Sequence, residues 1–351
     1  MDVFPECFFE NMLSQMEPRY LMVRYKRRQL VDRLNTAIKE RARSKDCDEA
    51  AEVRRAVMAA IRYHANSGNS GERLCNMGRY HNILYIAVKL CSDWNLDDNS
   101  IVIQLLNNIF QCERTFERLF VGAIFGNRAT HVISGWKSDF ESYEENLAAI
   151  EYFLKHATKA KLEYDNLKNG KKIRFIDIPL ESYRRATSAR IAAEFSEAEV
   201  LLLLLRYGAD MLTEYETDEM LTGQQSRQPF AFCVVSSYHL NQTAKSLACL
   251  KILLRTVSTM TAFPSGVVDL NMPFLVATRN ALGMNKFYFH PRLLQEGIIP
   301  PSRSQLTPPE LKHLSRCVIR NVLRDNWQLP LGIRSLKIPL SLQNYLDLLE
   351  D

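Results

Sequence analysis

Hydrophobic positions recur at helical spacing along most of the chain. Between residues 17 and 45, apolar side chains form an approximate stripe among many Lys and Arg residues, which predicts a long basic helix with one buried face. The same spacing predicts further helices over residues 48–63, 79–92, 98–124 and 141–167. The pattern indicates an all-α body.

Three polar, Gly-containing stretches interrupt this pattern. The clearest covers residues 66–71 and consists only of Asn, Ser and Gly, and the other two lie near residues 166–172 and 222–228. Such clusters are typical of loops, because Gly and small polar residues accept turn conformations that helices exclude. We therefore expect a modular helical body.

Three segments place paired aliphatic residues near the end of an amphipathic helix, at a spacing of about 50 residues. They cover residues 150–157, 200–210 and 249–255. Pro179, Pro229 and Pro273 are each followed by an apolar residue. Because Pro suits the first position of a helix, these sites predict the start of a partner helix.

The sequence Leu-Leu-Arg-Tyr-Gly-Ala-Asp at residues 204–210 resembles the ending of an ankyrin repeat, with Gly208 as the left-handed residue that ends the second helix. The spacing of about 50 residues exceeds the ~33 residues of a regular ankyrin unit, so the resemblance implies degenerate repeats or insertions. The alternative is an unrelated helical bundle with one similar turn.

A distinct segment begins after the prolines at positions 300, 301, 308 and 309. Its apolar residues recur on one face of a predicted helix and comprise Leu311, Leu314, Val318, Ile319, Val322 and Leu323. The intervening basic residues are predicted to keep the other face soluble and comprise Lys312, Arg316, Arg320 and Arg324.

This helix resembles the first half of a SOCS box, which the family carries as Leu-x-His-Leu-Cys-Arg-x-x-Ile-Arg. The residues that match in order are Leu311, His313, Leu314, Arg316, Ile319 and Arg320. Ser315 stands where the family often has Cys. The resemblance implies an elongin-binding site made of Leu311, Leu314, Ser315, Val318 and Ile319.

The last residues resemble the second half of the box, a Leu-Pro-aliphatic-Pro element before a short helix ending in Tyr-Leu. The resemblance implies a cullin-binding site made of Leu336, Ile338, Pro339, Leu342, Tyr345 and Leu346. Lys337 stands where the family often has its first proline. This departure concerns cullin binding more than elongin binding.

Taken together, the chain resembles the ankyrin-repeat and SOCS-box protein family. We expect an N-terminal helical region (1–140), ankyrin-like helical repeats (141–299) and a SOCS box (307–351). The resemblance implies a substrate-recognition adaptor of an elongin B/C and cullin-5 ubiquitin ligase with its RING partner, which recruits a target protein for ubiquitination. One alternative is a non-degradative scaffold that uses the box only to hold elongin B/C.

Charge and chemistry narrow the remaining function classes. The net charge of +5 is mild for 351 residues, so the basic helix at 17–45 is expected to be a solvated face rather than a nucleic-acid site. Phosphate-loop, nucleophile-elbow and His-Glu-x-x-His motifs are lacking, so we expect no enzyme activity. The eight Cys and seven His residues are dispersed, and we predict neither a metal site nor a cofactor.

The distribution of apolar residues also bears on location. No apolar run approaches the ~20 residues of a membrane-spanning helix, and the first ten residues lack the pattern of a signal peptide. We therefore expect the chain in the cytoplasm, with the nucleus as the alternative, and without insertion into a membrane.

Overall fold

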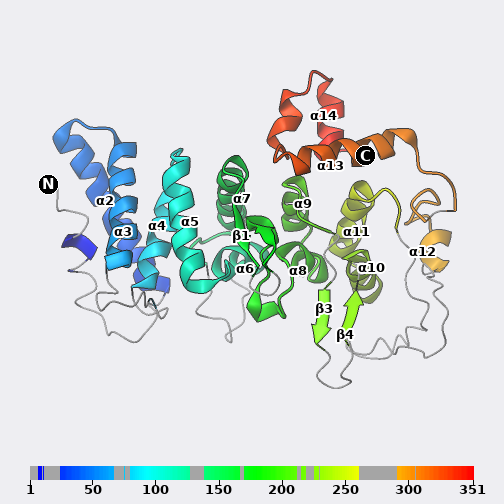
Figure 1. Ribbon diagram of the computed structural model, residues 1–351, viewed down its shortest axis with the longest axis horizontal. Helices are drawn as coiled ribbons and strands as arrows, with labels where there is room; N and C mark the ends of the chain where they lie inside the picture. Colours follow the sequence, from blue (N-terminus) through cyan, green and yellow to red (C-terminus); the bar gives the residue numbers. More distant parts are fainter. Residues whose placement is uncertain are drawn as a thin grey trace. The chain divides into compact units, whose positions relative to one another are not determined.

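The computed structural model is predominantly helical, in agreement with the predicted fold class (Figure 1). It describes residues 7–9, 11, 24–66, 75, 80–126, 138–166, 170–211, 215–218, 225–228, 230–260, 291–304 and 306–351. Within these residues, the strands form two small antiparallel hairpins. The predicted loop at 66–71 and the predicted helix start at Pro273 lie outside the described residues, apart from Asn66 itself.

The chain divides into two compact units, Met1–Ile191 and Ala192–Asp351. The predicted three-part division stays a prediction. The helices of the first unit are α2 (Arg24–Lys45), α3 (Glu49–Asn66), α4 (His81–Asp93), α5 (Asn99–Glu113), α6 (Glu117–Phe125) and α7 (Tyr143–Lys159). Successive helices pack against one another, because α3 contacts α2, α4 and α5, and α7 contacts α5 and α6. This packing buries apolar side chains such as Leu34, Ile61 and Phe120.

Two predicted helices of this unit are shorter than expected. The predicted helix over 98–124 is split into α5 and α6, because Arg114 adopts a left-handed conformation with φ of 59° and ends α5. The predicted helix over 141–167 ends at Lys159, and Lys161 has a φ of 52°. The apolar spacing runs on through both breaks, so periodicity alone did not reveal them.

The basic helix α2 is less solvated than predicted. Arg27 is 3% exposed and forms an ion pair with Asp139 at 2.7 Å. Arg28 donates to Glu141 at 2.8 Å, and Arg41 lies 3.4 Å from a carboxylate oxygen of Glu52. These cations therefore hold other parts of the first unit in addition to contributing charge to its surface.

A hairpin of β1 (Glu163–Asp165) and β2 (Lys172–Arg174) follows α7, with the 3-10 turns η3 (Phe175–Asp177) and η4 (Glu181–Tyr183) after it. The predicted helix start at Pro179 is wrong. The helix α8 (Ser188–Glu194) begins later, where Thr187 Oγ1 accepts a hydrogen bond from Arg190 N at 3.5 Å. Thr187 thus caps the helix, a role that Thr commonly takes.

The second unit carries the remaining elements. They are α9 (Ala198–Arg206), β3 (Tyr215–Asp218), β4 (Gln225–Gln228), α10 (Phe230–Asn241), α11 (Ala244–Thr256), α12 (Pro291–Gln295), α13 (Leu311–Asp325), η5 (Leu331–Ser335) and α14 (Leu340–Leu346). In this unit α11 packs against both α9 and α10 (Figure 1). The start of α10 at Phe230 fits the helix start predicted at Pro229.

The three aliphatic-rich segments lie in α7, α9 and α11, as the helical spacing predicted. The hairpin β1–β2 lies between α7 and α9 along the chain, and the hairpin β3–β4 lies between α9 and α11. These insertions account for the spacing of about 50 residues. Part of the loop predicted at 222–228 is the strand β4.

In the described part of the chain, no helix combines the length and apolar character that crossing a membrane requires.

Candidate protein-binding site at the C-terminus

The start of α13 is fixed by a polar contact with the preceding turn. Arg303 Nη1 donates to Glu310 at 2.7 Å, and Ser302 Oγ donates to the other carboxylate oxygen at 2.9 Å. The hydrogen bond from Arg303 is the largest cause that lowers the pKa of Glu310 to about 2. Glu310 itself is extended, with ψ of 139°, so the helix begins directly after it at Leu311.

One face of α13 presents apolar side chains to solvent. Leu311 is 78% exposed, Val318 62% and Val322 56%. Ile319 and Ser315 are also exposed and lie on the same face, whereas Leu314 is half-buried. We call the residues Leu311, Ser315, Val318, Ile319 and Val322 the α13 ridge. An exposed apolar stripe of this kind is a feature of helices that bind a partner.

The opposite face of α13 is polar and buried, which corrects the prediction that Arg316 and Arg320 keep it soluble. Arg316 is 3% exposed and Arg320 is 6% exposed. Arg320 donates to the carbonyl oxygens of Leu346 and Leu205, each at 2.6 Å. Both acceptors lie in the last turn of a helix, where carbonyls lack intrahelical donors, so the guanidinium satisfies two helix ends at once.

His313 forms a hydrogen bond at a third helix end, that of α11. Its Nε2 lies 2.7 Å from the carbonyl oxygen of Val257, directly after α11, and its Nδ1 lies 3.1 Å from Arg316 Nη2. Since a guanidinium only donates, Nδ1 accepts and Nε2 carries the proton. Burial is the largest cause that lowers the pKa of His313, and Arg303 and Arg316 act in the same direction.

Tyr345 of α14 lies against two cations of α13. The Arg316 guanidinium lies 4.0 Å from its ring centroid and the Lys312 ammonium 4.1 Å. Contacts of this kind are attractive because the ring face carries negative potential. They hold α14 against α13.

The segment after α13 has a small core of its own, made of Leu329, Ile333 and Leu346, with Leu323, Leu336 and Ile338 packed against it. Leu346 is 4% exposed and Tyr345 is buried. These two members of the predicted cullin-binding set therefore lie in the interior of the segment. Leu336 and Ile338 are half-buried.

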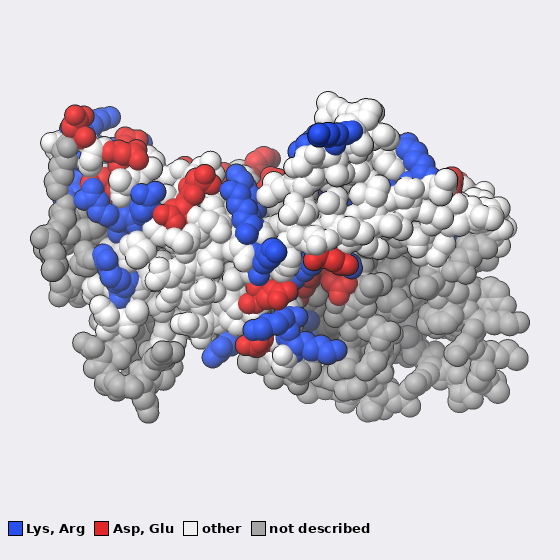
Figure 2. All heavy atoms as spheres, turned by 45° about the horizontal axis from the view of Figure 1, so that its top comes forward, with Lys and Arg blue, Asp and Glu red and all other residues white. Residues whose placement is uncertain are grey.

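The outward residues of the predicted cullin-binding set are Pro339 and Leu342. Leu340, at the start of α14, is exposed as well, although it is not part of the predicted set. Val322 of the α13 ridge was placed on the apolar face of the predicted helix but not in the predicted elongin-binding set. Figure 2 shows mostly uncharged surface over α13 and α14.

Two ion pairs and one close approach attach this segment to the rest of the second unit. Arg206 of α9 pairs with Asp347 at 2.7 Å, and Arg255 of α11 pairs with Asp351 at 2.7 Å. Gly208 has a φ of 80°, and a Cβ there would lie 2.9 Å from Arg324 Cγ. The predicted left-handed Gly208 is confirmed, and it also makes room for α13.

Comparisons with known proteins agree with the resemblance at the C-terminus. The SOCS box family matches residues 307–347. The protein named Ankyrin repeat and SOCS box protein 17 is 56% identical over 48 residues in Homo sapiens and equally in Macaca fascicularis. The match covers 14% of this chain and 16% of the length of each relative. No solved structure matches the chain.

Proposed function

With a SOCS box at the C-terminus of a helical body, we propose that this chain is a non-catalytic adaptor that recruits a target protein to an elongin B/C and cullin-5 ubiquitin ligase. The observation that carries the proposal is the α13 ridge, an apolar face left exposed within the segment that matches the box. An adaptor needs such a face, whereas a helix that only completes a core does not.

Elongin C is the proposed partner of the α13 ridge together with Leu314. Leu311 is its most exposed apolar side chain. Burying a leucine side chain at an interface stabilises the complex by ~1.5 to 3 kcal/mol, so Leu311 is the expected main contact. Ser315 contributes a smaller, more polar contact beside it.

Cullin-5, with its RING partner, is the proposed second partner. Among the predicted residues, Pro339 and Leu342 are exposed and suited to direct contact. Tyr345 and Leu346 support that surface from the interior. The helical body would hold the target protein, and ubiquitin transfer would then follow from the raised local concentration of target lysines, without chemistry from this chain. We place this activity in the cytoplasm or the nucleus.

The experiment is a pull-down with the full chain, probed for elongin C and cullin-5. Leu311→Asp is expected to reduce capture of both partners at least about tenfold, because it puts a charge where binding would bury an apolar side chain. Leu240→Asp is the matched control, since Leu240 of α10 is 55% exposed and lies outside the residues 307–347 that match the box. Equal capture by wild type and Leu311→Asp would refute the elongin site.

A second candidate function is a scaffold that holds elongin B/C without a cullin. Lys337 favours it, because this exposed lysine stands where the family often has a proline, in the half of the box that is expected to contact the cullin. Wild type that captures elongin C but not cullin-5 would support the scaffold. Leu342→Asp that loses only cullin-5 would support the adaptor.

A further inference from the structure

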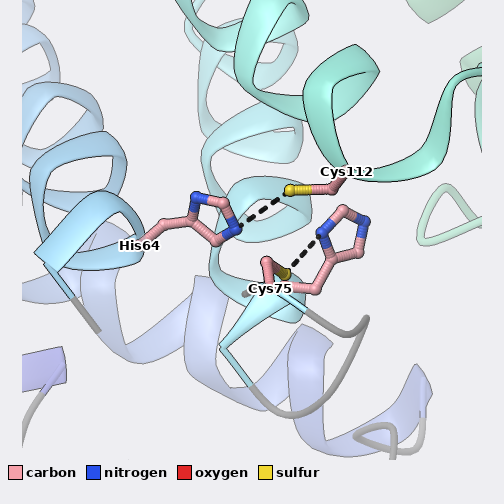
Figure 3. A group of neighbouring side chains, drawn as sticks. His64, Cys75 and Cys112 are labelled. Carbon is pink, nitrogen blue, oxygen red and sulfur yellow. Dashed lines mark hydrogen bonds between the residues drawn. The ribbon is translucent and has the colours of Figure 1, made fainter. Parts of the chain in front are cut away.

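Four potential metal ligands meet in the first unit, far from the α13 ridge in sequence. His64, Cys75, His81 and Cys112 each direct one ligand atom into a common space, and these atoms all lie within 4.8 Å of one another. Figure 3 shows His64, Cys75 and Cys112 pointing toward one another. The ligands come from the end of α3, the stretch before α4, the start of α4 and the end of α5.

The separations fit tetrahedral coordination. Cys75 Sγ lies 3.5 Å from His81 Nδ1, and Cys112 Sγ lies 3.5 Å from His64 Nε2. Zinc bonds of about 2.3 Å to sulfur and about 2.0 Å to nitrogen place neighbouring ligand atoms roughly 3.3 to 3.8 Å apart in a tetrahedron. Small side-chain rotations would therefore complete the site.

A supporting shell orients His81. Its Nε2 lies 2.5 Å from Glu113, and the Tyr85 hydroxyl donates to the same carboxylate at 2.8 Å and 2.9 Å. The carboxylate holds the proton on Nε2 and leaves the lone pair of Nδ1 directed at the cluster. A carboxylate behind a metal-binding histidine is the usual arrangement in zinc sites, because it fixes the ring and increases its basicity.

Burial distinguishes this cluster from a chance surface grouping. His81 is 1% exposed and His64 is 7% exposed, while the two cysteines are half-buried. Two thiolates and two imidazoles around one divalent cation give a neutral site, which a partly buried location favours. Thiolate and imidazole ligands in a tetrahedron select zinc among the common metals.

We propose that His64, Cys75, His81 and Cys112 bind a structural zinc ion that ties together the ends of α3 and α5 and the start of α4. Four protein ligands leave no open position, so the ion stabilises the fold and performs no catalysis. The expectation of no metal site rested on the dispersal of the Cys and His residues along the chain, and this cluster runs against it. The four ligands are scattered from position 64 to position 112, and tertiary structure brings them together.

The experiment measures metal in the purified full chain under reducing conditions. We expect about one zinc per chain, with X-ray absorption distances of about 2.3 Å to two sulfurs and about 2.0 Å to two nitrogens. Cys75→Ser and Cys112→Ser should each lose most of the zinc. Cys47→Ser is the control. Cys47 is also half-buried in this unit, but its thiol donates a hydrogen bond to Glu52 and it is not one of the four ligands.

If the serine variants do not fold, wild type still decides the question. Modification of its thiols should release about one equivalent of zinc, detected with a colorimetric chelator. Wild type that is purified without zinc and still has its full helical content would overturn the proposal. A Cys75–Cys112 disulfide, found by mass spectrometry of the native chain, would overturn it as well. Elongin capture through the α13 ridge is measured separately, so failure of either proposal leaves the other testable.

Discussion

Arg320 of α13 donates from Nη2 to the carbonyl oxygen of Leu205 in α9 at 2.6 Å, from a site that is only 6% exposed. Its Nη1 holds the end of α14 in the same way. One guanidinium therefore joins the C-terminal box to α9 of the second unit. This contact fixes which face of α13 turns inward and leaves the α13 ridge outside.

Loss of this guanidinium should destabilise the second unit. Arg320→Met removes the side-chain donor of the buried Leu346 carbonyl and one of two donors to the Leu205 carbonyl, which Gly208 N also contacts at 3.0 Å. Each lost bond costs about 1 to 3 kcal/mol, and removal of a desolvated charge offsets part of that cost. We expect a net loss of roughly 2 to 4 kcal/mol in urea unfolding. Arg334→Met, at an exposed arginine of η5, should be near neutral. Equal unfolding midpoints would show that the contact does not anchor α13.

Gly208 should tolerate no side chain. Gly208→Ala combines a left-handed φ of 80° with a Cβ that would lie 2.9 Å from Arg324 Cγ, so it should cost more than the ~1 to 2 kcal/mol of backbone strain alone. Gly297→Ala is the control, since Gly297 has a φ of 67° and no atom within 4 Å of the added Cβ. Similar losses in the two variants would mean that α13 accommodates the methyl group.

Acid should loosen α13 from α11. The pKa of His313 is lowered in the folded chain, with burial as the largest cause, and protonation would place a proton between Nδ1 and Arg316. The unfolded chain therefore takes up a proton first as the pH falls. Stability from the neutral ring is fully present above about pH 6.5 and is lost as the pH falls through that value toward the folded pKa.

Hydrogen exchange of the α13 amides should therefore accelerate between about pH 7.5 and pH 5.5, after correction for intrinsic rates. The nearby charged groups are Arg303 and Arg316, which lower the pKa of His313, and Glu310, which raises it. His313→Gln, which can still donate to Val257, should abolish the acceleration. The same pH dependence in wild type and variant would exclude His313 as its source.

Ser315 should limit elongin affinity. Ser315→Cys replaces an exposed hydroxyl on the α13 ridge with a less polar group, and we expect a gain on the order of 1 kcal/mol, or about fivefold in Kd. Titration calorimetry with elongin B/C measures it. Ser335→Cys, at an exposed serine of η5, controls for the added thiol. Unchanged affinity would place Ser315 outside the interface.

Alanine substitutions at Leu346 and Leu342 should have different effects, the first on the stability of the fold and the second on cullin-5 binding. Leu346→Ala opens the small core and should cost about 2 to 5 kcal/mol of unfolding free energy. Leu342→Ala, at a residue that is 40% exposed, should change stability by no more than about 0.5 kcal/mol and weaken cullin-5 capture. A stable Leu346→Ala variant would contradict the assignment of Leu346 to the core.

The sequence by itself determined the local features of the chain. Apolar spacing located most helices, because one face of a helix repeats every three to four residues wherever the helix packs. Leu311, His313, Leu314 and Ile319, in their order, identified the SOCS box, and the left-handed role of Gly208 followed from its place after an apolar helix.

Tertiary structure decided which faces are buried and which distant residues meet. Periodicity shows that α13 has an apolar and a basic face but not which one is covered. The basic face is buried because the ends of α9, α11 and α14 offer carbonyls that Arg320, His313 and their neighbours satisfy. The meeting of His64 with Cys112 likewise depends on the packing of α3 against α5, which no local pattern records.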